Sequence, residues 1–142
     1  MKLSKLLKEK VSSFIMTIDK IPFVYDDVLF KEAIDLMNLN KLGIVCIVDK
    51  NKKLKGVFTD GDIRRKIIKI QKPFSALFAD DVLLHTNLKP ITINKSKNIL
   101  NEIKLINKNK IWDLPIISNS GKLLGLLHMN DILKKILDTN FD

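Results

Sequence analysis

The sequence has few of the residues from which disulfides, metal sites and catalytic centres are built. Its 142 residues include one cysteine, two histidines and five glycines. A single cysteine excludes an internal disulfide, and Cys46, inside the apolar run Ile44–Val48, is expected to be a buried, reduced thiol. Apolar runs of about five or six residues exclude a membrane span, and Lys2, Lys5 and Lys8 exclude a signal peptide. We therefore expect a cytoplasmic protein that has no membrane partner.

Acidic residues are also scarce relative to basic ones. Sixteen Asp and Glu stand against 25 Lys and Arg, which gives a formal net charge of +9. Such an excess is one signature of nucleic-acid binding. Arginine, however, occurs only at Arg64 and Arg65, and the lysines are spread from Lys2 to Lys135. This spread favours a bias in residue usage, so we expect no nucleic-acid partner and keep lysine-driven binding of nucleic acid as the weakest alternative.

The sequence does contain an internal repeat. A shift of 69 positions aligns residues 41–48 with 110–117, and residues 53–67 with 122–136, without a gap. In this alignment Gly56 meets Gly125 and Asp62 meets Asp131. A composition of 46% hydrophobic and 29% charged residues is that of a folded chain with one domain or two very small ones. The repeat predicts two similar units of about sixty residues that fold together.

Apolar periodicity predicts the same order of elements in both units. In the first unit we expect a short extended segment (21–24), a helix (32–39), a strand (44–48), a turn (49–53), a strand (54–58) and a closing helix (63–70). In the second unit the corresponding elements are a short extended segment (90–93), a helix from 99, a strand (114–117), a turn (118–122), a strand (123–127) and a closing helix (132–136). Ser96 is the expected N-cap of the second unit's first helix.

This order predicts an α+β fold made of two β-α-β-β-α repeats. Two helices and a short segment cannot cover both faces of a sheet, so we expect the repeats to pack against each other with pseudo-two-fold symmetry. The expected boundaries are an N-terminal helical lead-in (1–10), repeat 1 (11–70), a linker (71–80), repeat 2 (81–138) and a tail (139–142).

The segment Gly56–Asp62 carries the clearest chemical signal, because a predicted strand ends there and a helix begins. Thr59 and Asp60 then lie at a helix N-terminus, where unpaired N–H groups and the helix dipole favour an anion. Gly61 lets a ligand approach the backbone, and Asp62 can accept hydrogen bonds from vicinal hydroxyls such as those of a ribose. The alternative is that Thr59 and Asp62 only form a capping box.

The duplication, the order of elements and the glycine-x-x-threonine-x-x-aspartate segment resemble a tandem pair of cystathionine-β-synthase (CBS) domains, or Bateman module. In that family the paired repeats bind nucleotide ligands in clefts between the units and regulate an attached enzyme or transporter. The threonine contacts phosphate and the aspartate contacts ribose, so the resemblance assigns these roles to Thr59 and Asp62. It implies no required cofactor and an adenine or cytidine nucleotide, or a nucleotide-sugar, as ligand.

A narrower resemblance, over about residues 11–138, is to the KpsF/GutQ group of arabinose 5-phosphate isomerases of Kdo and lipopolysaccharide biosynthesis. The segments that resemble this group are Gly56–Arg65, Ile21–Val24, Lys41–Gly43 and Gly125–Leu133. It implies a regulatory module that follows a sugar-isomerase domain in the parent chain, a domain for which 142 residues leave no room. The family enzymes are tetramers, and we expect a homodimer here. The alternative is a stand-alone CBS pair that regulates a different partner enzyme.

The resemblance selects two sets of residues. The ligand-binding residues of the first unit are Ile21, Pro22, Gly43, Ile44, Thr59, Asp60, Gly61, Asp62 and Arg64. A second, degenerate site consists of Ile91, Trp112, His128, Asn130 and Asp131. There, His128 replaces the phosphate-binding threonine; either the protonated ring holds an anion or the site stays empty. Trp112 either stacks on a base or fills an interface, and one of Arg64 and Arg65 is expected to reach a phosphate while the other faces solvent or a partner chain.

Other chemistry has little support in the sequence. Asp60 and Asp62 make a weak metal pair without a third ligand. His85 and His128 fit no Cys–His or Ser–His–Asp spacing. We expect neither a metal nor a catalytic residue. The alternative from another functional class is a small sugar-phosphate isomerase with His128 or His85 as its base.

Overall fold

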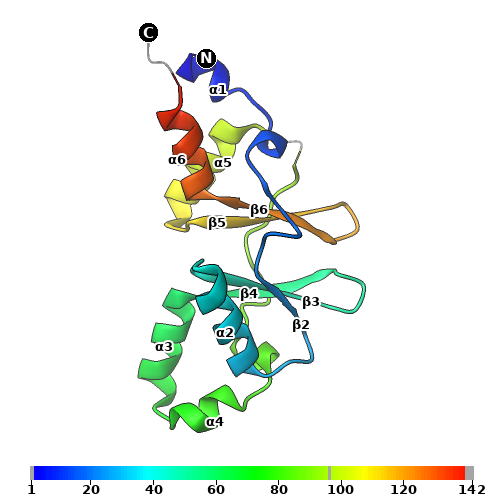
Figure 1. Cartoon of the computed structure of the whole chain (residues 1–142), viewed down its shortest axis with the longest axis vertical. Coiled ribbons are helices and arrows are strands. Elements are labelled where there is room, and N and C mark those ends of the chain that lie inside the picture. The colour runs from blue at the N-terminus through cyan, green and yellow to red at the C-terminus, as the bar shows by residue number, and fades with distance from the viewer. Residues whose placement is uncertain (1, 96, 140–142) are drawn as a thin grey trace. The chain divides into compact units, whose positions relative to one another are not determined.

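The computed structural model describes residues 2–95 and 97–139. It divides the chain into two compact units, one formed by Ile21–Pro90 and the other by Met1–Lys20 together with Ile91–Asp142. Among the described residues each unit has a three-stranded sheet, and its helices lie on one side of that sheet (Figure 1). Residues 11–20 thus pack with the second repeat, so the packed units and the sequence repeats begin at different positions.

The unit formed by Ile21–Pro90 has the sheet order β2-β3-β4. Its elements are β2 (Phe23–Tyr25), α2 (Phe30–Asn40), β3 (Ile44–Val48), β4 (Leu54–Thr59), α3 (Asp60–Ile70), α4 (Phe74–Phe78) and the 3-10 helix η2 (Val82–His85). β2 runs parallel to β3, and β4 runs antiparallel to it. All five residues of β3 are buried, as a continuous apolar run in a central strand predicts. The core beneath the sheet consists of Phe30, Ala33, Met37, Val45, Ile47, Phe58, Leu77 and Val82.

The other unit has the sheet order β1-β6-β5. Its elements are α1 (Leu3–Leu6), the 3-10 helix η1 (Val11–Ser13), β1 (Met16–Thr17), α5 (Ile99–Asn109), β5 (Asp113–Ile117), β6 (Leu123–His128) and α6 (Met129–Leu137). β1 pairs antiparallel with β6, with Met16 opposite Leu126. Lys135 of α6 donates a hydrogen bond to the carbonyl of Ser13 and lies 4.5 Å above the ring of Phe14. These contacts hold the N-terminal segment against α6.

The two units repeat each other at the 69-residue offset found in the sequence. α2 and α5 have 11 residues each and coincide after the shift, as do β3 with β5 and β4 with β6. Both hairpins carry their register shift at the same place, between Ile47 and Val48 and between Ile116 and Ile117. The predicted mixed helix-and-sheet fold is therefore confirmed for each unit.

Local details differ from the predictions in three places. The N-cap of α5 is Asn98, whose side chain accepts a hydrogen bond from the Leu100 amide at 2.8 Å; the predicted cap, Ser96, lies outside the described residues. The predicted linker 71–80 contains the helix α4. α2 begins at Phe30, two residues before the predicted start at Glu32, because the buried Phe30 ring belongs to the helix's apolar face.

Candidate functional site

Thr59 and Asp62 cap the N-terminus of α3. The Thr59 hydroxyl oxygen accepts a hydrogen bond from the Asp62 amide at 3.3 Å, and Asp62 Oδ2 accepts one from the Thr59 amide at 2.9 Å. This is the reciprocal capping box that the sequence allowed. The Thr59 hydroxyl proton has no acceptor among the described residues, so the hydroxyl can still donate to a ligand. The capping role is confirmed, and any ligand role has to coexist with it.

Arg65 extends this arrangement toward Gly61. Its Nη2 atom lies 2.7 Å from Asp62 Oδ1, and a Cβ atom on Gly61 would lie 3.1 Å from both Nη1 and Nη2. The guanidinium therefore covers Gly61, the residue at which close approach of a ligand was predicted. Arg64, the arginine selected from the sequence, is exposed and has no hydrogen bond or ion pair with a described residue. The three-residue spacing from Asp62 was the signal that could have identified Arg65.

Gly43 and Ile44 lie beside the capping box. Ile44 is the register partner of Thr59 in the β3–β4 ladder, and the Asp60 amide donates to the Gly43 carbonyl at 3.1 Å. A Cβ atom on Gly43 would lie only 2.8 Å from Asp60 Oδ2, so the absence of a side chain is what lets the carboxylate lie there. The structure thus brings Gly43, Ile44 and Asp60 to the corner of the sheet that the Thr59–Asp62 capping box occupies.

Ile21 and Pro22 reach the same end of the sheet from the opposite side of β3. The Pro22 carbonyl accepts a hydrogen bond from the Cys46 amide at 3.0 Å, and both Ile21 and Pro22 are buried. They belong to the framework of this unit. Their predicted contact with a ligand stays a prediction.

The equivalent corner of the other unit carries a histidine–carboxylate pair. His128 and Asp113 are opposite each other in the β5–β6 ladder, and His128 Nδ1 lies 2.5 Å from Asp113 Oδ1. The side chains are 12% and 8% exposed. The hydrogen bond with Asp113 raises the pKa of His128; burial opposes this rise, and the charges of Asp113 and Asp131 add to it. At the 69-residue offset His128 corresponds to Thr59 of the first unit, and Asp113 corresponds to Ile44.

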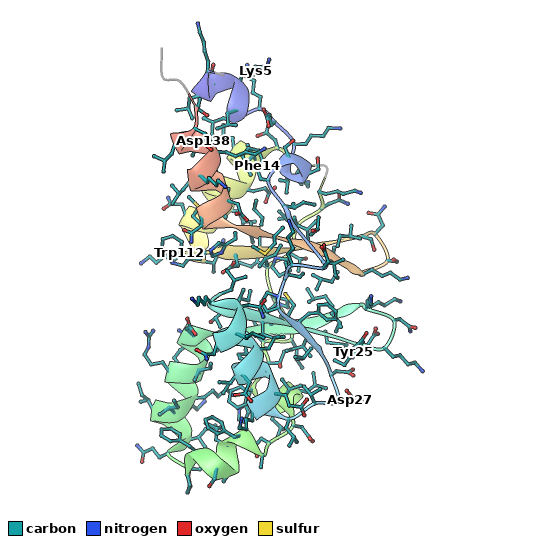
Figure 2. The ribbon with its side chains drawn as sticks, viewed as in Figure 1. Lys5, Phe14, Tyr25, Asp27, Trp112 and Asp138 are labelled. Atoms are coloured by element: carbon teal, nitrogen blue, oxygen red, sulfur yellow. The ribbon has the colours of Figure 1, made fainter. Side chains whose placement is uncertain are left out.

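The other residues of the predicted second site are Ile91, Trp112, Asn130 and Asp131. The Trp112 carbonyl accepts a hydrogen bond from the Met129 amide at 2.9 Å, which reproduces the contact between Gly43 and Asp60. The Trp112 side chain is 62% exposed (Figure 2), and Ile91 is 38% exposed. Asn130 and Asp131 lie in the first turn of α6, and His128 makes no side-chain hydrogen bond that caps this helix. The two predicted roles of Trp112, stacking on a base and filling an interface, both stay predictions.

The fold, the duplicated corner and the capping motif agree with a family model. The model of the CBS domain matches residues 11–69 and again residues 81–138. The chain belongs to the CBS-domain family. The predicted resemblance to a tandem CBS pair is thereby confirmed.

The curated relatives of this CBS pair carry such pairs within longer chains. An uncharacterised protein of Rickettsia prowazekii is 31% identical over 129 residues, which are 87% of this chain and 37% of that one. Inosine-5'-monophosphate dehydrogenase of Aquifex aeolicus is 34% identical over 79% of this chain and 22% of its own length. Arabinose 5-phosphate isomerase KdsD of Salmonella typhimurium is 26% identical over 93% of this chain and 39% of its own. This chain thus spans well under half of each relative.

Solved structures show the same fold. The CBS-pair protein CBSX2, in complex with AMP, superposes with a TM-score of 0.79 at 23% identity over 91% of this chain and 96% of its own. CbpB, in complex with c-di-AMP, gives a TM-score of 0.77 at 21% identity over 95% of this chain and 89% of its own. At these identities the likeness establishes the fold of the CBS pair.

Two further observations concern metal-binding groups and helix length. Within residues 2–95 and 97–139, three or more His, Cys, Asp or Glu side chains never gather closely enough to hold a metal ion, so Asp60 and Asp62 gain no third ligand. In the same residues no helix has the length and apolar character required to cross a membrane.

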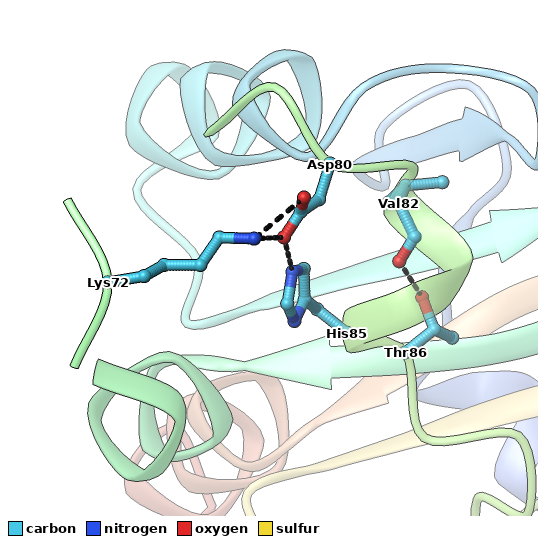
Figure 3. Close-up of polar contacts among 5 residues, drawn as sticks. All are labelled: Lys72, Asp80, Val82, His85 and Thr86. Atoms are coloured by element: carbon cyan, nitrogen blue, oxygen red, sulfur yellow. Dashed lines mark hydrogen bonds and ion pairs between the residues drawn. The ribbon is translucent and has the colours of Figure 1, made fainter. Parts of the chain in front are cut away.

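His85, the other histidine of the CBS pair, belongs to a polar cluster that sequence reasoning missed (Figure 3). Its Nε2 lies 2.8 Å from Asp80 Oδ2, and the two carboxylate oxygens of Asp80 lie 2.9 and 2.7 Å from Lys72 Nζ. Hydrogen bonds from Lys72 and then His85 lower the pKa of Asp80. The His85 ring is 4% exposed, and its centroid lies 4.6 Å from that of Phe30. A ring enclosed in this way cannot reach a substrate, so His85 is unsuited to act as a base.

Proposed function

We propose that this CBS pair is a non-catalytic regulatory module that binds an adenine nucleotide at the β4–α3 corner. The observation that carries the proposal is the capping box of Thr59 and Asp62 with Arg65 beside it. It combines a hydroxyl with a proton to donate, the N-terminus of an 11-residue helix and an exposed cation, each of which favours a phosphate.

Asp62 is suited to the ribose because its carboxylate has acceptor capacity left. Each carboxylate oxygen accepts about two hydrogen bonds, and in this chain Oδ2 takes one from the Thr59 amide and Oδ1 one from Arg65. Vicinal hydroxyls can therefore add to the carboxylate without breaking the cap. When a phosphate arrives, we expect Arg65 to turn from Asp62 to the phosphate, which is the more highly charged partner.

The ligands of similar CBS pairs support the choice of an adenine nucleotide. CBSX2 was crystallised with AMP and CbpB with c-di-AMP. A cytidine nucleotide or a nucleotide-sugar is the second choice, and it follows from the resemblance to the arabinose 5-phosphate isomerases. The exposed Trp112 offers a stacking surface for a base in the second site.

The identity of the regulated enzyme is a second, more specific proposal. We propose a sugar-isomerase domain of the arabinose 5-phosphate type in the same parent chain, which the similarity to KdsD and GutQ of Salmonella supports. The similarity to inosine-5'-monophosphate dehydrogenase supports the alternative that the pair regulates another enzyme. Adding the identified nucleotide to the parent isomerase and measuring its rate separates the two.

A homodimer formed through the helices is part of the same proposal. Every residue of α3, all of them described, keeps some exposure, and Ile67, Ile68 and Ile70 are 38%, 66% and 38% exposed. These isoleucines offer apolar surface to a second copy of the chain. Light scattering tests this: a monomeric mass at high protein concentration contradicts the dimer.

The enzyme alternative has one observation in its favour. A carboxylate that fixes one imidazole nitrogen, as Asp113 does for His128, is an arrangement that general bases use. Exchange of solvent deuterium into arabinose 5-phosphate by the purified chain would support catalysis. We expect no exchange.

A thermal-shift screen tests nucleotide binding directly. The chain is heated with AMP, ATP, CMP or a CMP-sugar, and a ligand at 100 times its Kd should stabilise the fold by about 2.7 kcal/mol. We expect the largest shift with an adenine nucleotide. If none of these compounds moves the transition, the proposed function is wrong.

A further inference from the structure

The buried face of α5 contains a glutamate. The buried residues of this helix are Ile99, Glu102 and Ile106. At the 69-residue offset they correspond to Phe30, Ala33 and Met37, which are the buried residues of α2. Two of the three positions are apolar in both units. At the third position the first unit has Ala33 and the second has Glu102, a residue that is 4% exposed.

The Glu102 side chain has no charged or hydrogen-bonding partner within the described residues. Burial raises its pKa, and the positive charge of Lys97 opposes that rise. The carboxylate oxygens are not among the enclosed, unpartnered polar atoms of the described residues, so they face the pocket that Glu102 lines.

Glu102 lines a pocket of ≈ 480 Å³, a size common for small-molecule sites. The polar groups around it come from Asn94, Lys97, Asn101, Ser118 and Asn119, and Leu105 contributes an apolar wall. Some of these groups are already occupied: the Asn94 amide donates to Asn119 at 3.2 Å, and Ser118 contacts Ser120 at 2.9 Å. The charged groups Glu102 and Lys97 are the strongest ones left for a ligand.

These two charges are near each other without touching. Lys97 acts on Glu102 through its charge, yet no ion pair within 4.0 Å joins them in the described part of the chain. An anion alone would be repelled by Glu102, and a cation alone would be repelled by Lys97. A neutral polyol would leave both charges without a counter-charge. A zwitterion places an opposite charge on each side chain.

We infer that this pocket binds a free α-amino acid, with the ammonium group on Glu102 and the carboxylate on Lys97. The Asn101 side chain can add a hydrogen bond to the ligand's carboxylate, and Leu105 packs against the side chain of an apolar ligand. The site lies apart from the nucleotide-binding residues in sequence and uses none of them. Its presence therefore does not depend on the proposed function.

Titration of the full chain with the common L-amino acids, one at a time and up to about 10 mM, tests this inference. We expect at least one amino acid to bind saturably. Calorimetry, or shifts of the amide resonances of α5, measures this binding. The N-acetyl derivative and the decarboxylated amine of that amino acid should each bind at least about tenfold more weakly, because each lacks one charged contact. Sorbitol is the probe for a polyol site.

Variants locate the binding. Glu102→Gln keeps the shape of the side chain and should weaken binding about tenfold or more, as should Lys97→Ala. Lys95→Ala removes a nearby exposed charge that does not line the pocket, and should leave the affinity unchanged. The inference is overturned if no amino acid binds saturably, if sorbitol binds in their place, or if Glu102→Gln binds as tightly as the wild type. A melting curve for each variant separates loss of binding from loss of folding.

Discussion

His128 and Asp113 form a hydrogen-bonded pair across two neighbouring strands, with Nδ1 and Oδ1 2.5 Å apart. Asp113 replaces Ile44 at the equivalent position, and His128 replaces Thr59. The second unit has therefore exchanged an apolar residue and a hydroxyl for a pair whose charge depends on pH. The two corners of the CBS pair are built alike in their backbone and differ in chemistry.

Asp113→Asn should lower the pKa of His128, because the hydrogen bond that the His128 ring donates to the Asp113 carboxylate is the main cause of its rise. An NMR titration of the ring protons measures this directly. Asp131→Asn is the matched control and should lower the pKa by less, since Asp131 acts only through its charge. If the two variants lower the pKa of His128 equally, the hydrogen bond between His128 and Asp113 is not the main cause of the raised pKa.

The same pair predicts a pH dependence of folding. Because the pKa of His128 is higher in the folded chain than its usual 6.5, the stabilisation by its charged form is complete below about pH 6.5. It is lost as the pH rises through the raised value. Asp113→Asn should therefore destabilise the chain more at pH 6 than at pH 9, as measured by urea denaturation. A destabilisation that does not change with pH would contradict this.

Glu102→Ala should stabilise the chain at pH 7 by up to about 1 kcal/mol, because it removes a carboxylate that burial partly desolvates, and Ala33 already fills the equivalent position in the first unit. The pKa of Glu102 in the folded chain is raised above its usual 4.5. The charged carboxylate therefore destabilises the folded chain only above about pH 4.5. Denaturation at pH 7 and at pH 4 should show a gain that disappears in acid. Glu32→Ala, on the exposed side of α2, serves as the control and should not stabilise the chain.

Gly56 and Gly43 should respond differently to alanine. A Cβ atom on Gly56 would lie 2.3 Å from the Asn87 carbonyl oxygen, a backbone atom that cannot move aside alone. We expect Gly56→Ala to destabilise the chain by about 2 kcal/mol or more. At Gly43 the close atom is the end of the Asp60 side chain, which can rotate, so Gly43→Ala should cost less than half as much. Denaturant midpoints compare the two, and equal losses would contradict this reading of the contacts.

The Lys72–Asp80–His85 cluster should stabilise the first unit in a pH-dependent way. The pKa of Asp80 is lowered, so the contribution of its charged form is complete above about pH 3.8 and is lost as the pH falls through the lowered value. Asp80→Asn should reduce the melting temperature at pH 7 and have less effect in strong acid. Asp81→Asn removes a neighbouring exposed carboxylate and should change the melting temperature less at pH 7.

The sequence predicts local structure well and long-range pairs poorly. Strand β3 has the predicted bounds, Ile44–Val48, because its apolar run ends at turn-forming residues on both sides. α2 and α5 end at Lys41 and Lys110 in the left-handed conformation, with φ of 55° and 54°, which lysine does not signal. The pairing of β1 with β6 joins residues more than a hundred positions apart, so no local pattern indicates it. The Asp113–His128 bond likewise needs the register of two strands.

At the candidate site the sequence identifies the motif but does not indicate the contact between Arg65 and Asp62. The spacing of Thr59 and Asp62 allows both a cap and a ligand contact, and the structure contains the cap. Arg65 pairs with Asp62 because one helical turn brings residue 65 back toward residue 62, and the predicted ligand contact of Arg64 stays a prediction.

The most direct test of the central claim is a calorimetric titration of AMP into the wild type, Asp62→Ala and Asp131→Ala. These aspartates are equivalent in the two units, and only Asp62 pairs with a threonine. The account predicts binding by the wild type, an affinity at least about tenfold lower in Asp62→Ala, and little change in Asp131→Ala. Equal AMP affinity in Asp62→Ala and the wild type would contradict it.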